Sequence, residues 1–212
     1  MPPGPANAAP LPPAALWPAA AALGPLLRQV VAAWIARQDR LADWEAASRA
    51  FPPAGAHWEP LARQIQLINA FQWREEDRSR AAGADAAALA GVKRAIDASN
   101  GRRVRAVEAL DAHIVGGLAA AGLLRAAAPL HSESPGSIVD RLSVLALKAH
   151  HLEAARGAAA AGGRSTLAER LATVTEQWDD LLACLDDLGT NVAAGRARVK
   201  LYRQVKHYGP PS

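Results

Sequence analysis

The stretch from Ser132 to Leu152 indicates the fold most clearly; it reads Ser-Glu-Ser-Pro-Gly-Ser-Ile-Val-Asp-Arg-Leu-Ser-Val-Leu-Ala-Leu-Lys-Ala-His-His-Leu. Pro135 and Gly136 are typical of the beginning of a helix, where proline is tolerated. On a 3.6-residue period, the apolar residues form one continuous stripe, made of Ile138, Leu142, Leu145, Ala149 and Leu152. The adjacent stripe is chemically mixed and consists of Ser137, Asp140, Arg141, Val144, Lys148 and His151. These stripes predict an amphipathic helix that carries an organised polar site at the edge of a helical core.

The rest of the chain follows the same helical period. Further helices are predicted over residues 26–50, 58–80 and 86–115, and a last one begins at Thr166-Leu-Ala-Glu169, which fits a capping box, and continues to Val192. The prolines and the glycine of Phe51-Pro-Pro-Ala-Gly55 end the first of them. No segment shows the alternation of a half-buried strand. We therefore predict an all-α fold, an antiparallel helical bundle of about five helices.

Length and composition predict one folded domain. The chain has 212 residues, of which 50% are hydrophobic and 21% are charged. Residues 1–24 are rich in proline and alanine and lack a positive amino-terminal region, so we expect a flexible leader there and a single helical domain over residues 25–212. No targeting signal is evident, which predicts a cytoplasmic protein. Prolines interrupt the apolar runs of the leader, so no membrane span is expected.

Charge and motifs exclude several classes of function. The net charge of +4 is small and dispersed, so we expect no nucleic-acid partner. The single Cys184 rules out a disulfide framework and lies in an apolar run, where we expect a buried, inert thiol. Nucleophile-elbow, P-loop and dinucleotide-binding motifs are absent, and so are the Glu-x-x-His and His-Glu-x-x-His metal patterns. We assign no metal site, and the sequence leaves the cofactor open.

Polar residues share faces on two other predicted helices. Antiparallel pairing around a turn near Gly83 would place Trp73 beside Lys93, and Asn69 beside Asp97 and Asn100. Folding back of the helix over residues 135–156 would bring Asp140 and Arg141 toward Glu108 and Asp111. The candidate ligand-binding residues are Asn69, Trp73, Glu76, Asp77, Lys93, Asn100, Arg141 and Lys148; the candidate catalytic residues are Asp97, Asp140 and His151.

Three interpretations of these residues stay open. The mixture of amide, carboxylate and cationic groups favours a cavity between helices that binds a small polar or anionic ligand. An enzyme would use Asp97 or Asp140 with His151 as acid and base, which requires the groups to lie within hydrogen-bond reach. In the third interpretation the charges are structural ion pairs of a partner-binding protein. The oligomeric state stays open in all three.

Four segments resemble a known bacterial family, catalogued as domain of unknown function 4254. They are Asn69-Ala-Phe-Gln-Trp-Arg-Glu-Glu-Asp77, Lys93-Arg-Ala-Ile-Asp-Ala-Ser-Asn100, Ser134-Pro-Gly-Ser-Ile-Val-Asp-Arg-Leu-Ser-Val-Leu-Ala-Leu-Lys148 and Tyr202-Arg-Gln-Val-Lys-His-Tyr208. The chain departs from the family pattern at Arg74, where a histidine is expected, and at Gly101 and Arg105, which replace a glutamine and an aspartate. The resemblance implies an uncharacterised helical protein with a role in cell-surface glycan metabolism.

Overall fold

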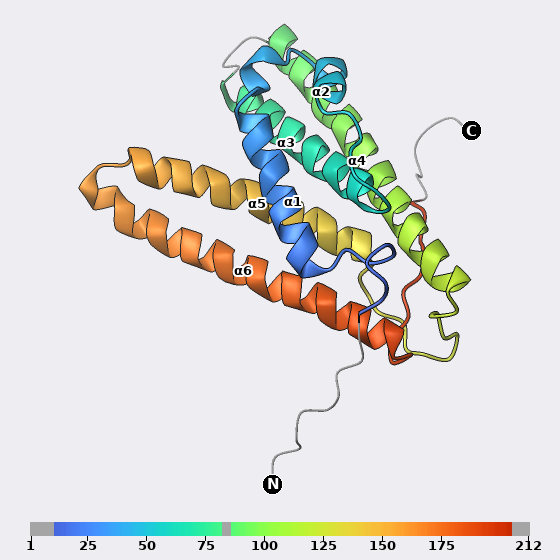
Figure 1. Cartoon of the computed structure of the whole chain (residues 1–212). Coiled ribbons are helices and arrows are strands. Elements are labelled where there is room, and N and C mark those ends of the chain that lie inside the picture. Colours follow the sequence, from blue (N-terminus) through green and yellow to red (C-terminus); the bar gives the residue numbers. More distant parts are fainter. Residues whose placement is uncertain (1–10, 82–85, 205–212) are drawn as a thin grey trace.

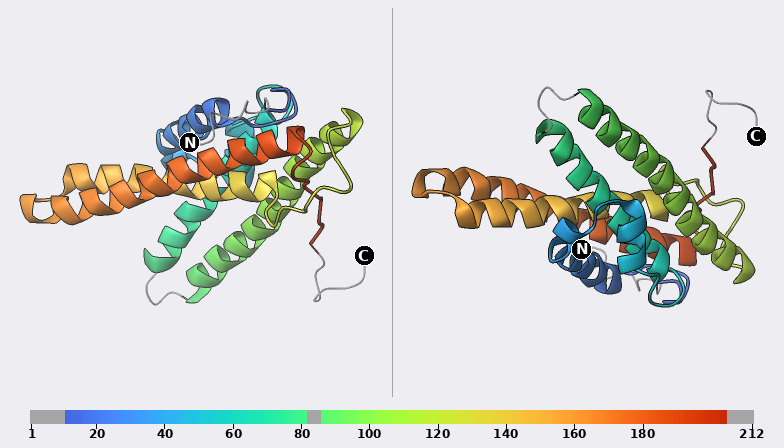
Figure 2. Two further views of the ribbon diagram at one scale, coloured as in Figure 1. Left: turned by 90° about the horizontal axis from the view of Figure 1, so that it is seen from below. Right: turned by 90° about the horizontal axis from the view of Figure 1, so that it is seen from above.

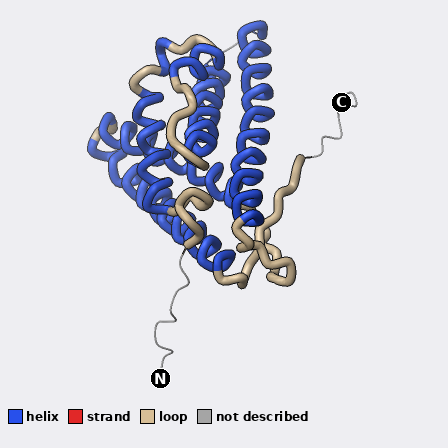
Figure 3. The backbone as a smooth tube through the Cα atoms, turned by 45° about the vertical axis from the view of Figure 1, so that its right-hand side comes forward, coloured by secondary structure: helices blue, strands red, loops and turns tan. Residues whose placement is uncertain are grey.

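The computed structural model describes residues 11–81 and 86–204, and its elements are helical. They are α1 (Ala20–Ile35), the short 3-10 helix η1 (Gln38–Arg40), α2 (Trp44–Ala50), α3 (Glu59–Ala81), α4 (Ala86–Ala120), α5 (Pro135–Ala158) and α6 (Ala161–Ala193). Within those ranges no strand occurs (Figure 3). One isolated bridge joins Leu130 and Arg198 there. The all-α prediction is confirmed, and the described part of the chain has six α-helices where about five were expected.

Two helical hairpins cross to form the body of the protein. One consists of α3 and α4, the other of α5 and α6, and α1 packs against α3, α5 and α6 (Figures 1 and 2). The hairpin of α5 and α6 extends beyond the other helices at its turn around residues 159–160 (Figure 1). The crossing brings the beginning of α5 against α4 and the middle of α3.

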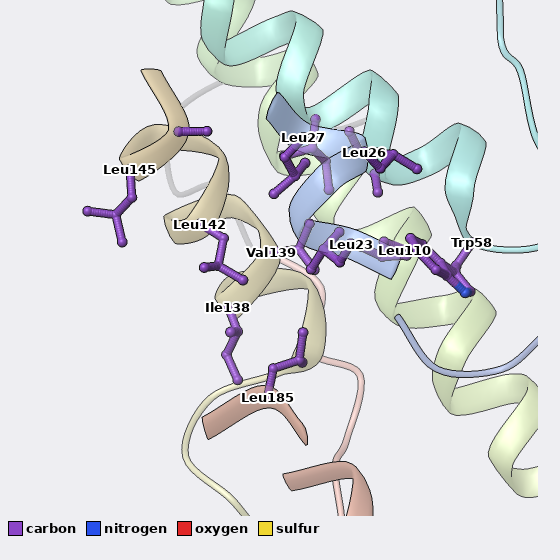
Figure 4. Packing of buried hydrophobic residues seen from close by; sticks show 14 of the residues in the cluster. Leu23, Leu26, Leu27, Trp58, Leu110, Ile138, Val139, Leu142, Leu145 and Leu185 are labelled. Atoms are coloured by element: carbon purple, nitrogen blue, oxygen red, sulfur yellow. The ribbon is translucent and has the colours of Figure 1, made fainter. Parts of the chain in front are cut away.

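The predicted apolar stripe of α5 forms part of the central core. Ile138, Leu142 and Leu145 are buried in the core cluster. In Figure 4, Ile138 points toward Leu185 of α6, and the neighbouring Val139 points toward Leu23 of α1. Each such side chain stabilises the fold by about 1.5–3 kcal/mol relative to an exposed one. Ala149 and Leu152 are only half-buried, because they lie on the part of the hairpin that leaves the body.

The predicted helix over residues 26–50 is two helices. α1 ends at Ile35, and after η1 the side chain of Asp43 accepts a hydrogen bond from the Ala46 N–H at 2.8 Å, which caps α2. An aspartate at this position satisfies an orphan donor of a new helix, and it therefore favours a restart over continuation. The apolar period continues across this break, so hydrophobic pattern alone did not reveal it.

The expectation of a flexible leader is wrong for residues 11–24. Trp17 is 1% exposed, and the Ala14 carbonyl accepts a hydrogen bond from Trp58 Nε1 at 2.8 Å. The Ala20 N–H donates to Asp186 Oδ1 of α6 at 2.9 Å, and α1 begins at that residue. The apolar side chains of this segment are buried against the bundle, which stabilises its order despite the prolines. The first ten residues of the expected leader lie outside the described residues.

Two further expectations fail near α6. The helix begins at Ala161, so the proposed capping residue Thr166 lies within it and is exposed. The turn ahead of Thr166 contains Gly162 and Gly163, which have low helix propensity, so local propensity does not explain this earlier start. Cys184 is exposed, because the apolar run that contains it turns only one side to the core. Among the described residues, no helix is both long and apolar enough to cross a membrane.

Candidate functional site

The beginning of α5 is fixed by a carboxylate from α4. Ser134 caps the helix, and its Oγ accepts a hydrogen bond from the Ser137 N–H at 3.2 Å. Asp111 of α4 accepts from the Gly136 N–H at 2.7 Å and from Ser134 Oγ at 2.5 Å. A Cβ on Gly136 would lie 2.8 Å from Asp111 Oδ1 and 2.9 Å from the Val107 carbonyl oxygen. Only glycine permits this close approach, so the beginning of α5 is fixed against α4.

Asp111 is an unusual carboxyl group because it is buried. Desolvation raises its pKa above the ordinary value of 3.8, although the hydrogen bonds from Ser134 and Gly136 act to lower it. The nearby charge of Glu108 also raises this pKa. The site therefore contains a carboxyl group whose proton is held more tightly than in water.

Asp140 lies at the centre of a network that joins α3 to α5. Asn69 Nδ2 donates to Asp140 Oδ1 at 2.7 Å and also to the hydroxyl of Ser143. Ser143 Oγ donates to the Asp140 carbonyl at 2.7 Å, and Gln66 Nε2 donates to the Ser143 carbonyl at 3.1 Å. Asn69 of α3 thus orients the Asp140 carboxylate from one side, and Gln66 fixes the adjacent backbone of α5.

Arg103 of α4 faces the same carboxylate from the other side. Its guanidinium lies 4.0 Å from Asp140 Oδ2, and its side chain is 35% exposed. This separation is an ion-pair distance, but it is too long for a hydrogen bond. Arg103 therefore keeps its donors available while Asp140 holds it in place.

Two cavities meet at Arg103 and Asp140, and together they form what we call the polar cleft. One measures about 270 Å³ and lies between α4, the beginning of α5 and the C-terminal segment. The other measures about 720 Å³ and runs between α5 and α6. Both are lined by Arg103, His131, Ser132, Glu133 and Asp140. Their combined lining mixes cations, carboxylates and hydroxyls.

Further cations border the polar cleft. Arg141 pairs with Glu133 at 2.8 Å, and Lys200 lies 5.1 Å over the ring of Tyr202. Lys148 is exposed and has no hydrogen bond or ion pair with any residue that the structure describes. The C-terminal segment is held across α4 by the Gln204 N–H, which donates to Glu108 Oε1 at 2.7 Å. The segment thereby brings Lys200 and Tyr202 to the cleft.

The predicted site residues divide into several groups. Asp140, Arg141 and Lys148 line the polar cleft, and Asn69 contacts it through Asp140. Trp73 and His151 stack elsewhere between α3 and α5, with ring centroids 4.8 Å apart and planes inclined by 6°. Burial lowers the pKa of His151, an effect increased by His150 and opposed by Asp77. Asp140 and His151 are eleven residues apart on one helix, roughly 16 Å, so they are not an acid–base pair.

The remaining predicted residues do not join the polar cleft. Lys93 and Asp97 are exposed on α4, and Glu76 is half-buried on α3; none of them lines either cavity. Asn100 accepts a hydrogen bond from Gln72 at 3.1 Å, where Asn69 was the expected neighbour. The expected pairing of α3 with α4 assumed that the two helices are aligned about the midpoint of their turn. The Gln72–Asn100 pair shows that they are offset from that alignment.

Several residues of the polar cleft were not predicted as site residues. They are Arg103, Glu108, Asp111, His131, Ser132, Glu133, Ser134, Ser137, Lys200 and Tyr202. Ser134 directly before Pro135 is a helix-cap signal that pointed to the beginning of α5. Glu108 and Asp111 share a stripe of α4, but Arg103 and the C-terminal residues carry no local signal, because tertiary packing alone brings them here. Among the described residues, no three His, Cys, Asp or Glu side chains cluster as a metal site would require.

The fold and the cleft define a class: an all-helical protein with a mixed polar cleft where its two hairpins cross. Residues 59–201 match the family model described as "Protein of unknown function (DUF4254)", and the chain belongs to that family. Neither the curated proteins nor the solved structures gave a significant match to this chain.

Arg74, the main departure from the family pattern, has a structural position here. It donates to the carbonyls of Gln38 and Leu41, and it pairs with Glu75 at 2.8 Å. Its guanidinium also lies 5.3 Å from the ring centroid of Trp34. Arg74 joins α3 to the turn between α1 and α2 and does not line the polar cleft.

Proposed function

We propose that the polar cleft binds a small polar ligand that carries an anionic group. The observation that supports this most directly is Arg103, a half-buried guanidinium at the junction of two cavities. Its nearest carboxylate oxygen is at 4.0 Å, and no described residue accepts a hydrogen bond from it. Arginine has five N–H donors in a planar fork that matches a carboxylate or a phosphate. A ligand oxygen would complete this set of hydrogen bonds.

The surroundings of Arg103 favour a ligand that is both anionic and rich in hydroxyls. Lys148 has no partner among the described residues and adds positive charge, whereas Asp140, Glu108 and the hydroxyl of Ser137 accept hydrogen bonds. Sugar phosphates combine an anion with several hydroxyl donors. This chemistry supports the proposal that the protein acts in cell-surface glycan metabolism.

Thermal stability in the presence of sugar phosphates tests this function. A ligand at a hundred times its dissociation constant stabilises a protein by about 2.7 kcal/mol, or roughly 5–11 °C in melting temperature for a chain of this size. We expect such a shift with sugar phosphates and none with the corresponding neutral sugars. Native mass spectrometry of the purified protein would identify a ligand that co-purifies.

A matched pair of variants assigns the binding to the cleft. Arg103→Gln should abolish the stabilisation, because it removes the charge and most of the donors. Arg105→Gln is the control, since Arg105 is exposed on the same helix and does not line the cleft. Equal shifts in both variants, or no shift with any sugar phosphate, would contradict the proposal.

An enzyme that acts on the same ligand is the second candidate. Its supporting observation is Asp111, whose raised pKa would allow the carboxyl group to donate a proton. Phosphorus NMR of a bound sugar phosphate separates the two functions. Formation of a product that Asp111→Asn abolishes would support the enzyme, and an unchanged ligand would support binding alone.

A further inference from the structure

A third cavity, of about 260 Å³, differs from the polar cleft because its lining is mostly apolar. It lies between α1, α2 and α3. Its walls include Val30 of α1 and Leu67 of α3, and residues 50–54 close one side. Its size is just below the range of typical ligand cavities, about 300–1,000 Å³. None of its lining residues belongs to the polar cleft.

The aromatic side chains that line this cavity pack against buried aromatic residues. Phe51 lies 6.1 Å from Trp34, and Trp44 lies 5.6 Å from Phe71 in an edge-on arrangement. Trp34 and Phe71 are themselves buried in the core. Because Phe51 and Trp44 contact these buried rings, they do not move easily into the cavity, and the cavity is preformed.

The charged residues that line the cavity are all positive. Two arginines, Arg37 and Arg63, border the cavity, and no aspartate or glutamate lines it. Arg37 donates to the Ala50 carbonyl at a long 3.5 Å and lies 5.4 Å from the ring centroid of Phe51. Arg63 donates to Gln29 Oε1 at 3.0 Å. Within the described chain, neither guanidinium has a carboxylate within salt-bridge distance.

Arg63 also has an unsatisfied donor. Its Nε is buried and has no hydrogen-bond partner. A buried N–H without an acceptor is costly, because the group has lost water and gained nothing in return. The guanidinium as a whole borders the cavity, where a ligand carboxylate can accept from its other N–H groups.

We propose that this cavity binds an amphipathic carboxylate, such as a medium-chain fatty acid. The hydrocarbon chain lies against Val30, Leu67 and the rings of Trp44 and Phe51. The carboxylate pairs with Arg37 and Arg63, where it supplies the negative charge that the lining lacks. The hydrocarbon chain of such a ligand does not suit the polar cleft, and no residue lines both sites, so binding at one can be tested without the other.

Isothermal titration calorimetry with octanoate tests the proposal on the full chain. We expect saturable binding of octanoate, and much weaker binding of octanol, which lacks the charge, and of acetate, which lacks the chain. Arg37→Gln and Arg63→Gln should each weaken octanoate binding at least about tenfold, since each removes a charged hydrogen bond. Arg49→Gln is the matched control, because Arg49 is exposed on α2 and does not line the cavity.

A cavity-filling variant distinguishes a loss of octanoate binding at the site from a loss that is caused by misfolding. Ala33→Phe keeps both arginines and occupies the space of the chain, so it should abolish octanoate binding while circular dichroism shows an intact fold. No saturable heat with octanoate at low millimolar concentration would overturn the proposal. Equal affinity for octanol or acetate, or unchanged octanoate affinity in Arg37→Gln, Arg63→Gln and Ala33→Phe, would overturn it as well.

Discussion

Replacing Gly136 by alanine should separate the beginning of α5 from α4. The added Cβ would lie 2.8 Å from Asp111 Oδ1 and 2.9 Å from the Val107 carbonyl oxygen, whereas ordinary contacts begin near 3.4 Å. One of the two neighbours is backbone, so the helices have to move apart by about half an ångström. Overpacking of this kind costs about 1–3 kcal/mol. The displacement also weakens the hydrogen bond from the Gly136 N–H to the Asp111 carboxylate, worth about 1.5–3 kcal/mol.

Helix propensity acts in the opposite direction and offsets part of this loss. Alanine is favoured over glycine by about 1 kcal/mol in a helix, so the net decrease in the free energy of unfolding should be about 2–4 kcal/mol. In a chain of this size, that corresponds to a decrease of roughly 4–16 °C in melting temperature. Urea unfolding followed by circular dichroism measures the first quantity, and a thermal scan measures the second.

Gly157→Ala is the matched control, because Gly157 lies in the same helix and its added Cβ would contact nothing within 4 Å. We expect this variant to be as stable as the parent or slightly more stable, by up to about 1 kcal/mol. If Gly136→Ala is as stable as Gly157→Ala, the close approach of α5 to α4 does not hold as described, and the geometry of the polar cleft would need revision.

Four other predictions concern stability. Trp17→Ala should lower the free energy of unfolding by about 3–5 kcal/mol in urea titrations, because Trp17 is buried. Tyr202→Ala, at an exposed position, should change it by less than about 0.5 kcal/mol, and comparable effects of the two variants would refute the docking of residues 11–19. Asn69→Ala leaves Asp140 Oδ1 without its donor and should cost about 1–3 kcal/mol, against less than about 0.5 kcal/mol for the exposed Lys93→Ala. Burial raises the pKa of Asp111, so the contribution of this residue to stability decreases as the pH rises from 3.8 through the folded-state pKa. Asp111→Asn should flatten this part of the stability–pH curve, and an unchanged slope would contradict the raised pKa. The pKa of His151 is lowered, so its contribution decreases as the pH falls below 6.5 toward the folded-state pKa; His151→Gln should reduce that loss, and the NMR titration of the His151 ring should show the lowered midpoint directly.

The parts of the fold that were predicted from sequence are those in which local signals agree. Pro135 at the first position of α5 and the stripe of Ile138, Leu142 and Leu145 identify both the helix and its buried face. The errors lie at helix boundaries. Thr166 fits a capping box, but α6 begins at Ala161 and passes through Gly162 and Gly163, which helix propensity does not explain. Asp43 caps a new helix within an apolar period that continues across the break.

The site was predicted only in part, because its contacts join residues that are far apart in the chain. Asn69 meets Asp140 across 71 residues, and no spacing rule reports such a pairing. Asp140, Arg141 and Lys148, which line the cleft, were expected from sequence because they share one face of one helix. Arg103, Lys200 and Tyr202 come from elements whose placement depends on the crossing of two hairpins, which one sequence does not specify.

The hydrogen bond between Ala20 and Asp186 spans 166 residues, and it has a consequence for the timing of synthesis. Chains are made at about 5–20 residues per second, so α6 follows the first helix by roughly 8–33 s. During that interval Trp17 and Leu23 have no surface on α6 to bury against, although helix formation itself takes only about a microsecond. The apolar side chains of the nascent amino-terminal segment therefore stay without their α6 contacts until the last helix is made, and its docking on α6 is a late contact of the fold.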